Sequence, residues 1–206
     1  MNLSQIMEVP TTASREELER DRWDGDNCLS YSQDGTRVLD AENFPSEVTV
    51  QDGTRVICDD VFAFQDYMAG LRIGEEVPLD SRSSYLEKIH LPDSVTHIGK
   101  GAFAECGELL SIRLPKELLL IGDSAFVDCW QLERLSFPAG LRAIGAGAFQ
   151  GCINLYRIRL GKAVEYIGED AFDDCPSLEE IQVPKGCKDH YKALLPKRLH
   201  KYITEK

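Results

Sequence analysis

The amino-acid sequence predicts a solenoid of short coils stacked along one axis, and three observations carry this prediction. A 23-residue unit recurs without insertion. The same positions of each unit are apolar, in the pattern L-x-x-I/L-x-L/F-P/G, V/L-x-x-I-G, A-F and C. The 206-residue chain is 43% hydrophobic and 28% charged, which suits one folded domain with a buried core. Such a period is typical of stacked coils, since no coil can bury its apolar side alone. The units begin at Leu86, Leu109, Leu132 and Leu155, with a partial copy at Leu178.

The first part of each coil is predicted to be a short strand. In the coil that begins at Leu132, Leu135 and Phe137 alternate with Arg134 and Ser136, so the two pairs point to opposite sides. Stacking these strands gives a parallel sheet. A proline or glycine ends each strand, at the point where the ladder can lose a donor: Pro92, Pro115, Pro138, Gly161 and Pro184.

A second extended piece follows, which in the same coil runs from Leu141 to Ile144. The glycine after it is expected to adopt a positive φ that a side chain would strain. These glycines are Gly99, Gly122, Gly145 and Gly168. The A-F pair then places one ring per coil in the interior, so we predict an aromatic stack of Phe103, Phe126, Phe149 and Phe172.

Four of the seven cysteines lie at the same position of successive coils: Cys106, Cys129, Cys152 and Cys175. They are expected to form a row with neighbours about 4.8 Å apart. A zinc site needs ligands that converge on one point, about 2.3 Å away. We therefore interpret these cysteines as small apolar core residues, and we expect no metal or other cofactor. A disulfide between neighbouring coils is the alternative, and it would require an oxidising compartment.

The string LxxIxLPxxVxxIGxxAFxxC resembles the repeat of the BspA-like leucine-rich-repeat family, which is common in surface and secreted proteins of Bacteroidetes. The resemblance is close over residues 86–184 and looser over 48–62, where Cys58 replaces the glycine and Val61 the alanine. Upstream, CLSYSQDGTRVLD resembles the hairpin that opens these arrays, with Asp34-Gly35 as its turn. The resemblance implies a leucine-rich-repeat right-handed solenoid of the α/β superhelix class, rich in β-structure with short turns or 3-10 segments. It also implies adhesive or scaffolding roles and no shared catalytic residues.

Residues 1–27 are predicted to form an N-terminal helix or tail, because Ser14-x-x-Glu17 is a capping-box signal. The expected helix has about two turns and packs Leu18 or Trp23 on the array; a charged tail is the alternative. The solenoid takes residues 28–184, with a hairpin and an eroded coil over 28–62 and regular repeats over 86–184.

The stretch 63–85 breaks the period. Insertions on solenoids map to one face, so we hypothesise that this one shapes partner choice. Residues 185–206 are predicted to form a helical cap, with Tyr191, Leu194 and Leu195 at helical spacing.

Several function classes are disfavoured. A net charge of -12 disfavours nucleic acid as a partner, and no run of eighteen apolar residues predicts membrane insertion. The opening residues have neither a basic nor an apolar signal region, so we expect a cytoplasmic protein, or a cell-surface one if an export signal has been lost. No metal or nucleophile motif includes any of the four histidines, and His90 and His97 are interpreted as surface residues. We therefore expect neither an enzyme nor a small-molecule substrate.

The outward strand positions supply the candidate binding residues. On the first sheet they form a basic strip, predicted to meet an acidic partner surface: Lys88, His90, Arg113, Arg134, Arg157 and Arg159. Neutralisation by Glu87, Glu133 and Glu179 is the alternative. On the second piece, Leu119, Leu120, Ala143 and Tyr166 form a candidate apolar patch, unless the insertion covers it. The sequence thus predicts a non-catalytic binding module, most simply a protein-protein interaction scaffold. The alternative is a surface or secreted adhesin-type binder of an anionic ligand or glycan.

Overall fold

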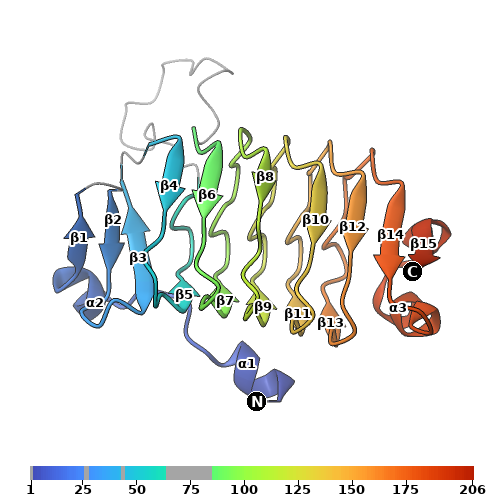
Figure 1. Ribbon diagram of the computed structural model, residues 1–206, viewed down its shortest axis with the longest axis horizontal. Helices are drawn as coiled ribbons and strands as arrows, with labels where there is room; N and C mark the ends of the chain where they lie inside the picture. Colours follow the sequence, from blue (N-terminus) through green and yellow to red (C-terminus); the bar gives the residue numbers. More distant parts are fainter. Residues whose placement is uncertain (1, 26–27, 43–44, 64–84) are drawn as a thin grey trace, which may run out of the picture.

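The computed structural model describes residues 2–25, 28–42, 45–63 and 85–206, and it confirms the predicted solenoid (Figure 1). The hypothesis about the insertion falls on residues 64–84, outside the described part of the chain. The coils stack along the long axis, and each regular coil adds one strand to each of two sides. Among the described residues, no helix is long and apolar enough to cross a membrane.

The first side is formed by the predicted first strands, which pair in parallel. Their ladder is divided into the sheets β4-β6-β8 and β10-β12-β14-β15, so β8 and β10 belong to different sheets. In β4, β6, β10 and β12 the central residue is buried and its neighbours are more exposed, as the alternation predicts. The strands are β4 (Glu47–Thr49), β6 (Lys88–His90), β8 (Ser111–Ile112), β10 (Arg134–Ser136), β12 (Arg157–Arg159) and β14 (Glu180–Val183).

The second side is an eight-stranded sheet in the order β1-β2-β3-β5-β7-β9-β11-β13. It opens with β1 (Arg22–Asp24), β2 (Leu29–Tyr31) and β3 (Arg37–Ala41). The pairs β1-β2 and β2-β3 are antiparallel, which confirms the predicted hairpin, and Gly35 in its turn has φ 72°. From β3 onward the pairing is parallel. The remaining strands are β5 (Val56–Ile57), β7 (His97–Ile98), β9 (Leu120–Ile121), β11 (Ala143–Ile144) and β13 (Tyr166–Ile167).

A continuous aromatic stack fills the interior between the two sides. The ring centroids of Phe103 and Phe126 are 4.9 Å apart, and those of Phe126 and Phe149 are 5.2 Å apart. Phe172 continues the stack at one end, and Phe62 of the eroded coil joins it at the other. The predicted stack is therefore confirmed and extends by one ring, which shows that the eroded coil shares the core of the regular coils.

The cysteine row also follows the prediction. Each thiol donates to the carbonyl oxygen of the phenylalanine in the preceding coil, as Cys129 does to Phe103 at 3.2 Å and Cys152 to Phe126 at 3.2 Å. All are free thiols. Burial raises the pKa of Cys129 well above its usual value and that of Cys175 to about 11. The cysteines thus pack as core residues that also satisfy a buried carbonyl.

The prediction that the glycine after the second strand of each coil has a positive φ is wrong. None of Gly99, Gly122, Gly145 and Gly168 has a positive φ. A Cβ at Gly145 would instead lie 2.5 Å from the backbone nitrogen of Asp123 in the preceding coil. Positive φ occurs two residues later, with φ 60° at Gly101 and Gly147. The glycine is required because neighbouring coils approach each other there, leaving no room for a side chain.

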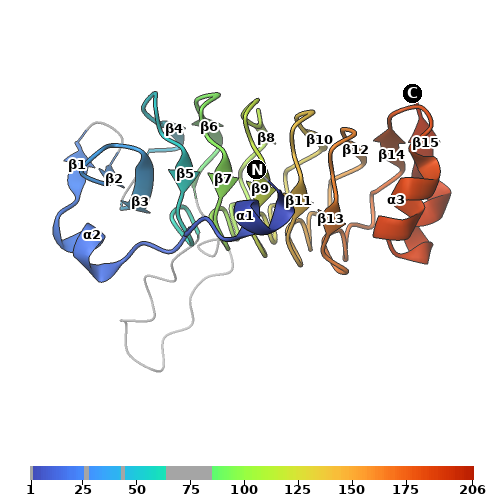
Figure 2. The same cartoon turned by 90° about the horizontal axis from the view of Figure 1, so that it is seen from below.

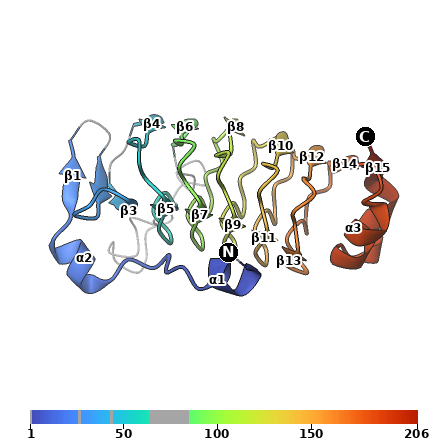
Figure 3. The same ribbon diagram turned by 60° about the horizontal axis from the view of Figure 1, so that its bottom comes forward.

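The N-terminal prediction is partly correct. The Ser14 capping box is present, but α2 (Arg15–Glu19) is shorter than expected, and Leu18 and Trp23 are 43% and 50% exposed. Trp23 lies on β1, which adds an edge strand to the hairpin, so its side chain does not reach the core. An additional helix, α1 (Leu3–Met7), runs under the second sheet and buries Ile6 to 1% exposure (Figures 2 and 3).

The C-terminal prediction is confirmed. The helix α3 (Lys188–Leu194) buries Tyr191, and Leu195 directly after it is 4% exposed. The 3-10 helix η3 (Lys197–Tyr202) follows, and then β15 (Ile203–Glu205). The strand β15 pairs in parallel with β14, so it takes up the hydrogen-bonding edge that the last coil would otherwise expose.

Candidate functional site

The N-terminal half of the basic strip is neutralised within the protein. Glu47 accepts from Lys88 Nζ at 2.7 Å and lies 2.8 Å from His90 Nε2. The hydrogen bond from Lys88 is the main reason that the pKa of Glu47 is lowered. Arg113 Nη2 lies 2.9 Å from Asp93, which also pairs with Lys116. These three side chains therefore have carboxylate partners, although not the glutamates considered from the sequence.

The C-terminal half of the strip is organised around one aromatic ring. The guanidinium carbons of Arg134 and Arg157 lie 5.0 and 5.7 Å from the centroid of Tyr156. The pairing of β10 with β12 places Arg134 beside Arg157, and Ser136 beside Arg159. We call Arg134, Arg157 and Arg159 the arginine patch. Arg113 is not part of it, because it follows β8 of the other sheet and pairs with Asp93.

The three arginines differ in their ionic partners. Arg157 Nε donates to Glu180 Oε2 at 2.7 Å. The pKa of Glu180 is lowered to about 2, first by a hydrogen bond from Gln182 and then by those from Lys206 and Thr204. Within the described ranges, Arg134 and Arg159 form no ion pair, and both are exposed. Positive charge is thus left available on two paired strands of an acidic protein.

A small cavity of about 180 Å³ lies at one end of this patch. Arg159 and Lys206 line it together with Gln182, Leu160 and the chain that leaves β14. Lys206 Nζ lies 3.2 Å from Glu180, so the arginine is the cation with more freedom to meet an incoming anion.

The second-sheet face is partly covered, and the interpretation of His97 as a surface residue is wrong. His97 is 2% exposed, because the N-terminal segment with α1 lies over it. Its Nε2 lies 3.1 Å from the carbonyl oxygen of Ile6, and its Nδ1 lies 2.8 Å from Thr96 Oγ1. Burial lowers the pKa of His97, and the charge of Arg55 lowers it further.

The apolar patch predicted on this face is correspondingly reduced. Ala143 is fully buried, Leu119 and Leu120 are half-buried, and Tyr166 is 40% exposed. Leu119 lines a cavity of about 300 Å³ together with Val9 and Pro10 of the N-terminal segment. Asn2-x-x-Gln5, a second capping box, was the sequence signal that could have predicted this covering helix.

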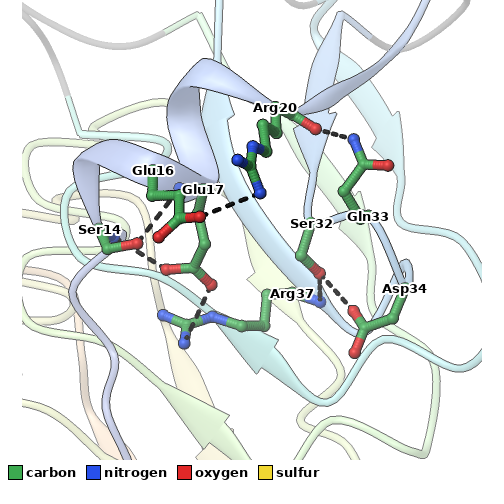
Figure 4. A pocket seen from close by; sticks show the side chains of 8 residues that line it. All are labelled: Ser14, Glu16, Glu17, Arg20, Ser32, Gln33, Asp34 and Arg37. Carbon is green, nitrogen blue, oxygen red and sulfur yellow. Dashed lines mark hydrogen bonds and ion pairs between the residues drawn. The ribbon is translucent and has the colours of Figure 1, made fainter.

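A polar cleft of about 390 Å³ lies between α2 and the hairpin turn (Figure 4). Four of its five charged side chains form ion pairs: Arg37 lies 3.4 Å from Glu17, and Arg20 lies 3.0 Å from Glu16. The backbone hydrogen bond from Ser14 is the main reason that the pKa of Glu17 is lowered. The ion pair between Arg37 and Glu17 therefore holds α2 against the hairpin. In the described part of the chain, no three His, Cys, Asp or Glu residues are grouped as metal ligands would be.

Comparison with known proteins agrees with this architecture. The model of the BspA type leucine rich repeat region matches residues 81–195 in six copies. The chain is similar to a solved leucine-rich-repeat protein of T. pallidum, with 24% identity and a TM-score of 0.61, over 83% of this chain and 71% of that one. It is similar to a leucine-rich cell surface protein from Faecalibacterium prausnitzii, with 26% identity and a TM-score of 0.64, over 81% of this chain and 40% of that one.

The pneumococcal vaccine antigen PcpA is a third similar structure, with 19% identity and a TM-score of 0.61. The match covers 86% of this chain and 46% of PcpA, so the chain spans less than half of this protein and of the cell surface protein. The T. pallidum and pneumococcal structures show the fold alone. No curated protein matches the chain.

Proposed function

Because the chain belongs to the BspA-type leucine-rich-repeat family, whose solenoid is generally a non-catalytic binding scaffold, we propose that it is a protein-protein interaction scaffold. The arginine patch is its contact site, and the partner presents an acidic surface. The observation that carries the proposal is the exposure of Arg134 and Arg159, neither of which pairs with a carboxylate of the described residues, on paired strands of a chain with net charge -12.

Electrostatics favours an acidic partner for this patch. Like charges that lie side by side repel each other, and an acidic surface that faces them removes this cost. The ring of Tyr156 holds two guanidinium groups, each by a cation-π contact worth about 0.5–1 kcal/mol at an exposed site. Side chains that are already positioned lose less conformational entropy on binding.

A charge-reversal experiment tests the proposal. Binding partners are first recovered by affinity capture with the intact protein and identified by mass spectrometry. We expect the double variant Arg134→Glu, Arg159→Glu to bind the recovered partner at least about tenfold more weakly at low salt, with a flatter salt dependence. These two positions are chosen because, in the described part of the chain, neither arginine pairs with a carboxylate that its loss would leave unpaired. An unchanged affinity would reject the patch as the site.

Two exposed cations away from the patch supply the control. Lys188→Glu and Lys197→Glu change the net charge equally, and both side chains are exposed at the C-terminal end of the solenoid and pair with no carboxylate of the described residues. Equal weakening by the control pair would assign the effect to net charge and not to the arginine patch.

An anionic glycan recognised at a cell surface is the second candidate. It is favoured by the similarity to the F. prausnitzii structure, which is described as a cell surface protein. The same arginines would bind sulfate or carboxylate groups. Patch-dependent retention on immobilised heparin, with no protein partner recovered, would favour this candidate over the first.

A further inference from the structure

Large apolar side chains are exposed on consecutive turns that lead into the first-side strands. Trp130 and Ile153 directly follow the core residues Cys129 and Cys152 and are 38% and 46% exposed. Leu110 begins the approach to β8 and is 59% exposed, and half-buried Tyr156 begins the approach to β12. We call Leu110, Trp130, Ile153 and Tyr156 the apolar corner.

The stacking of the coils brings these turns together. The backbone N–H of Gln131 donates to Gly107 at 3.2 Å, and that of Tyr156 donates to Glu133 at 3.0 Å. Successive turns are therefore hydrogen-bonded to each other, about 4.8 Å apart. The strands β8, β10 and β12 that they enter lie next to one another in the middle of the solenoid (Figure 1).

The repeat itself does not require apolar residues here. The position after the core cysteine is Gly107 in one coil and Pro176 in another. The position after the leading leucine is glutamate in three coils: Glu87, Glu133 and Glu179. The solenoid therefore folds with small or charged residues at these positions, and the apolar ones are concentrated in neighbouring coils. Exposed apolar side chains gathered on neighbouring coils favour an interaction site.

The apolar corner is continuous with the arginine patch. Tyr156 belongs to the corner, and its ring contacts the guanidinium groups of Arg134 and Arg157. Trp130 lies four residues before Arg134. Tryptophan, tyrosine and arginine are the residues most enriched where protein interfaces concentrate their binding energy.

We infer that the apolar corner and the arginine patch form one docking surface for an extended acidic protein segment that carries large apolar side chains. This inference rests on the proposed function and specifies its partner. Carboxylates of the segment meet Arg134 and Arg159, and its apolar side chains cover Leu110, Trp130 and Ile153. A glycan fits this surface less well, because its hydroxyl groups would lose water against Leu110 and Ile153 without gaining a hydrogen-bond partner.

The test uses two short synthetic peptides and the natural reporter Trp130. One peptide alternates glutamate with leucine and phenylalanine, and the other has serine in place of each apolar residue. In a Trp23→Phe background, Trp130 is the remaining tryptophan. We expect the first peptide to shift its emission to shorter wavelength and to bind at least about tenfold more tightly than the second.

Variants assign the contribution of the corner. Ile153→Ser with Leu110→Ser should remove the advantage of the apolar peptide, whereas Leu18→Ser, an equally exposed position on α2, should leave it unchanged. Thermal unfolding of each variant checks that the fold is intact, which exposed positions should permit. Equal binding of the apolar peptide by the corner variants and the parent would overturn the inference.

The remaining outcomes separate the two proposals. If Arg134→Glu, Arg159→Glu weakens both peptides while the corner variants weaken neither, the proposed function stands and the inference fails. If neither peptide binds, the inferred extended acidic segment fails, whereas the proposed function is still decided by the charge-reversal test on the recovered partner. Corner-dependent binding of heparin, or a dimer in sedimentation that the corner variants abolish, would reassign the surface to a glycan or to a second copy.

Discussion

Replacing Ile6 by alanine should release the N-terminal helix without unfolding the solenoid. The helix α1 has five residues, too few to be stable in water by itself. It is held by the buried side chain of Ile6 and by the hydrogen bond between its carbonyl and His97. Truncating a buried isoleucine to alanine costs about 2–5 kcal/mol. A loss of about 3 kcal/mol raises the undocked population roughly a hundredfold.

Opening should stop near Thr11, whose carbonyl accepts from the backbone of Asp59 at 3.1 Å. Hydrogen exchange followed by mass spectrometry measures it. The amides of Ile6 and Glu8, bonded within α1 at 3.1 and 3.0 Å, should exchange roughly a hundredfold faster in the variant.

The amide of Gly145, which donates to Ile121 at 2.8 Å within the second sheet, should stay protected. Met7→Ala, at a neighbouring position that is 51% exposed, is the matched control and should leave exchange unchanged. Unchanged protection of α1 in the Ile6→Ala protein, or an equal loss of protection across the second sheet, would refute this reasoning.

Three further predictions concern the interior. Burial lowers the pKa of His97 below its usual 6.5, so the folded state disfavours protonation. The stabilisation that depends on neutral His97 should be fully present above about pH 6.5 and should be lost below it. His97→Gln should reduce this loss, as measured by urea unfolding at about pH 7.5 and pH 5. Gly145→Ala should destabilise the fold by about 3 kcal/mol or more, because the new Cβ would meet backbone atoms of the preceding coil. Gly147→Ala, at φ 60°, should cost only about 1–2 kcal/mol of stability. Equal shifts of the thermal unfolding temperature in the two variants would contradict the packing argument. A thiol reagent should modify partly exposed Cys187 in the native protein and buried Cys152 only after unfolding, as peptide mapping would reveal; equal rates would contradict the assigned burial.

The repeat explains why so much of this fold could be predicted. A 23-residue period with apolar positions in phase determines which side chains face inward, because each coil can bury them only against its neighbours. The aromatic stack, the cysteine row, the hairpin turn at Asp34-Gly35 and the C-terminal helix near Tyr191 follow from such local or periodic signals.

The partners of surface groups could not be predicted in this way. The carboxylates that pair with Lys88, His90 and Arg113 lie on other coils or turns: Glu47 is on β4 of the eroded coil and Asp93 is in a turn, and the period does not show which side chains they meet. The same is true of Tyr156, whose ring contacts arginines of two coils. The arginine patch is therefore smaller than the predicted strip, because ion pairs depend on three-dimensional proximity.

The sequence by itself determined the class of fold, the coil boundaries and the interior, since these depend on composition and spacing. The tertiary structure alone decided that the glycine of each coil allows close backbone approach and does not adopt a positive φ. The sequence of a single coil does not show how closely the next coil packs against it. It also decided that α1 covers His97, a contact across 91 residues of separation. Periodicity specifies which side of a coil faces the core. Which groups contact the other side depends on segments that are distant in the sequence.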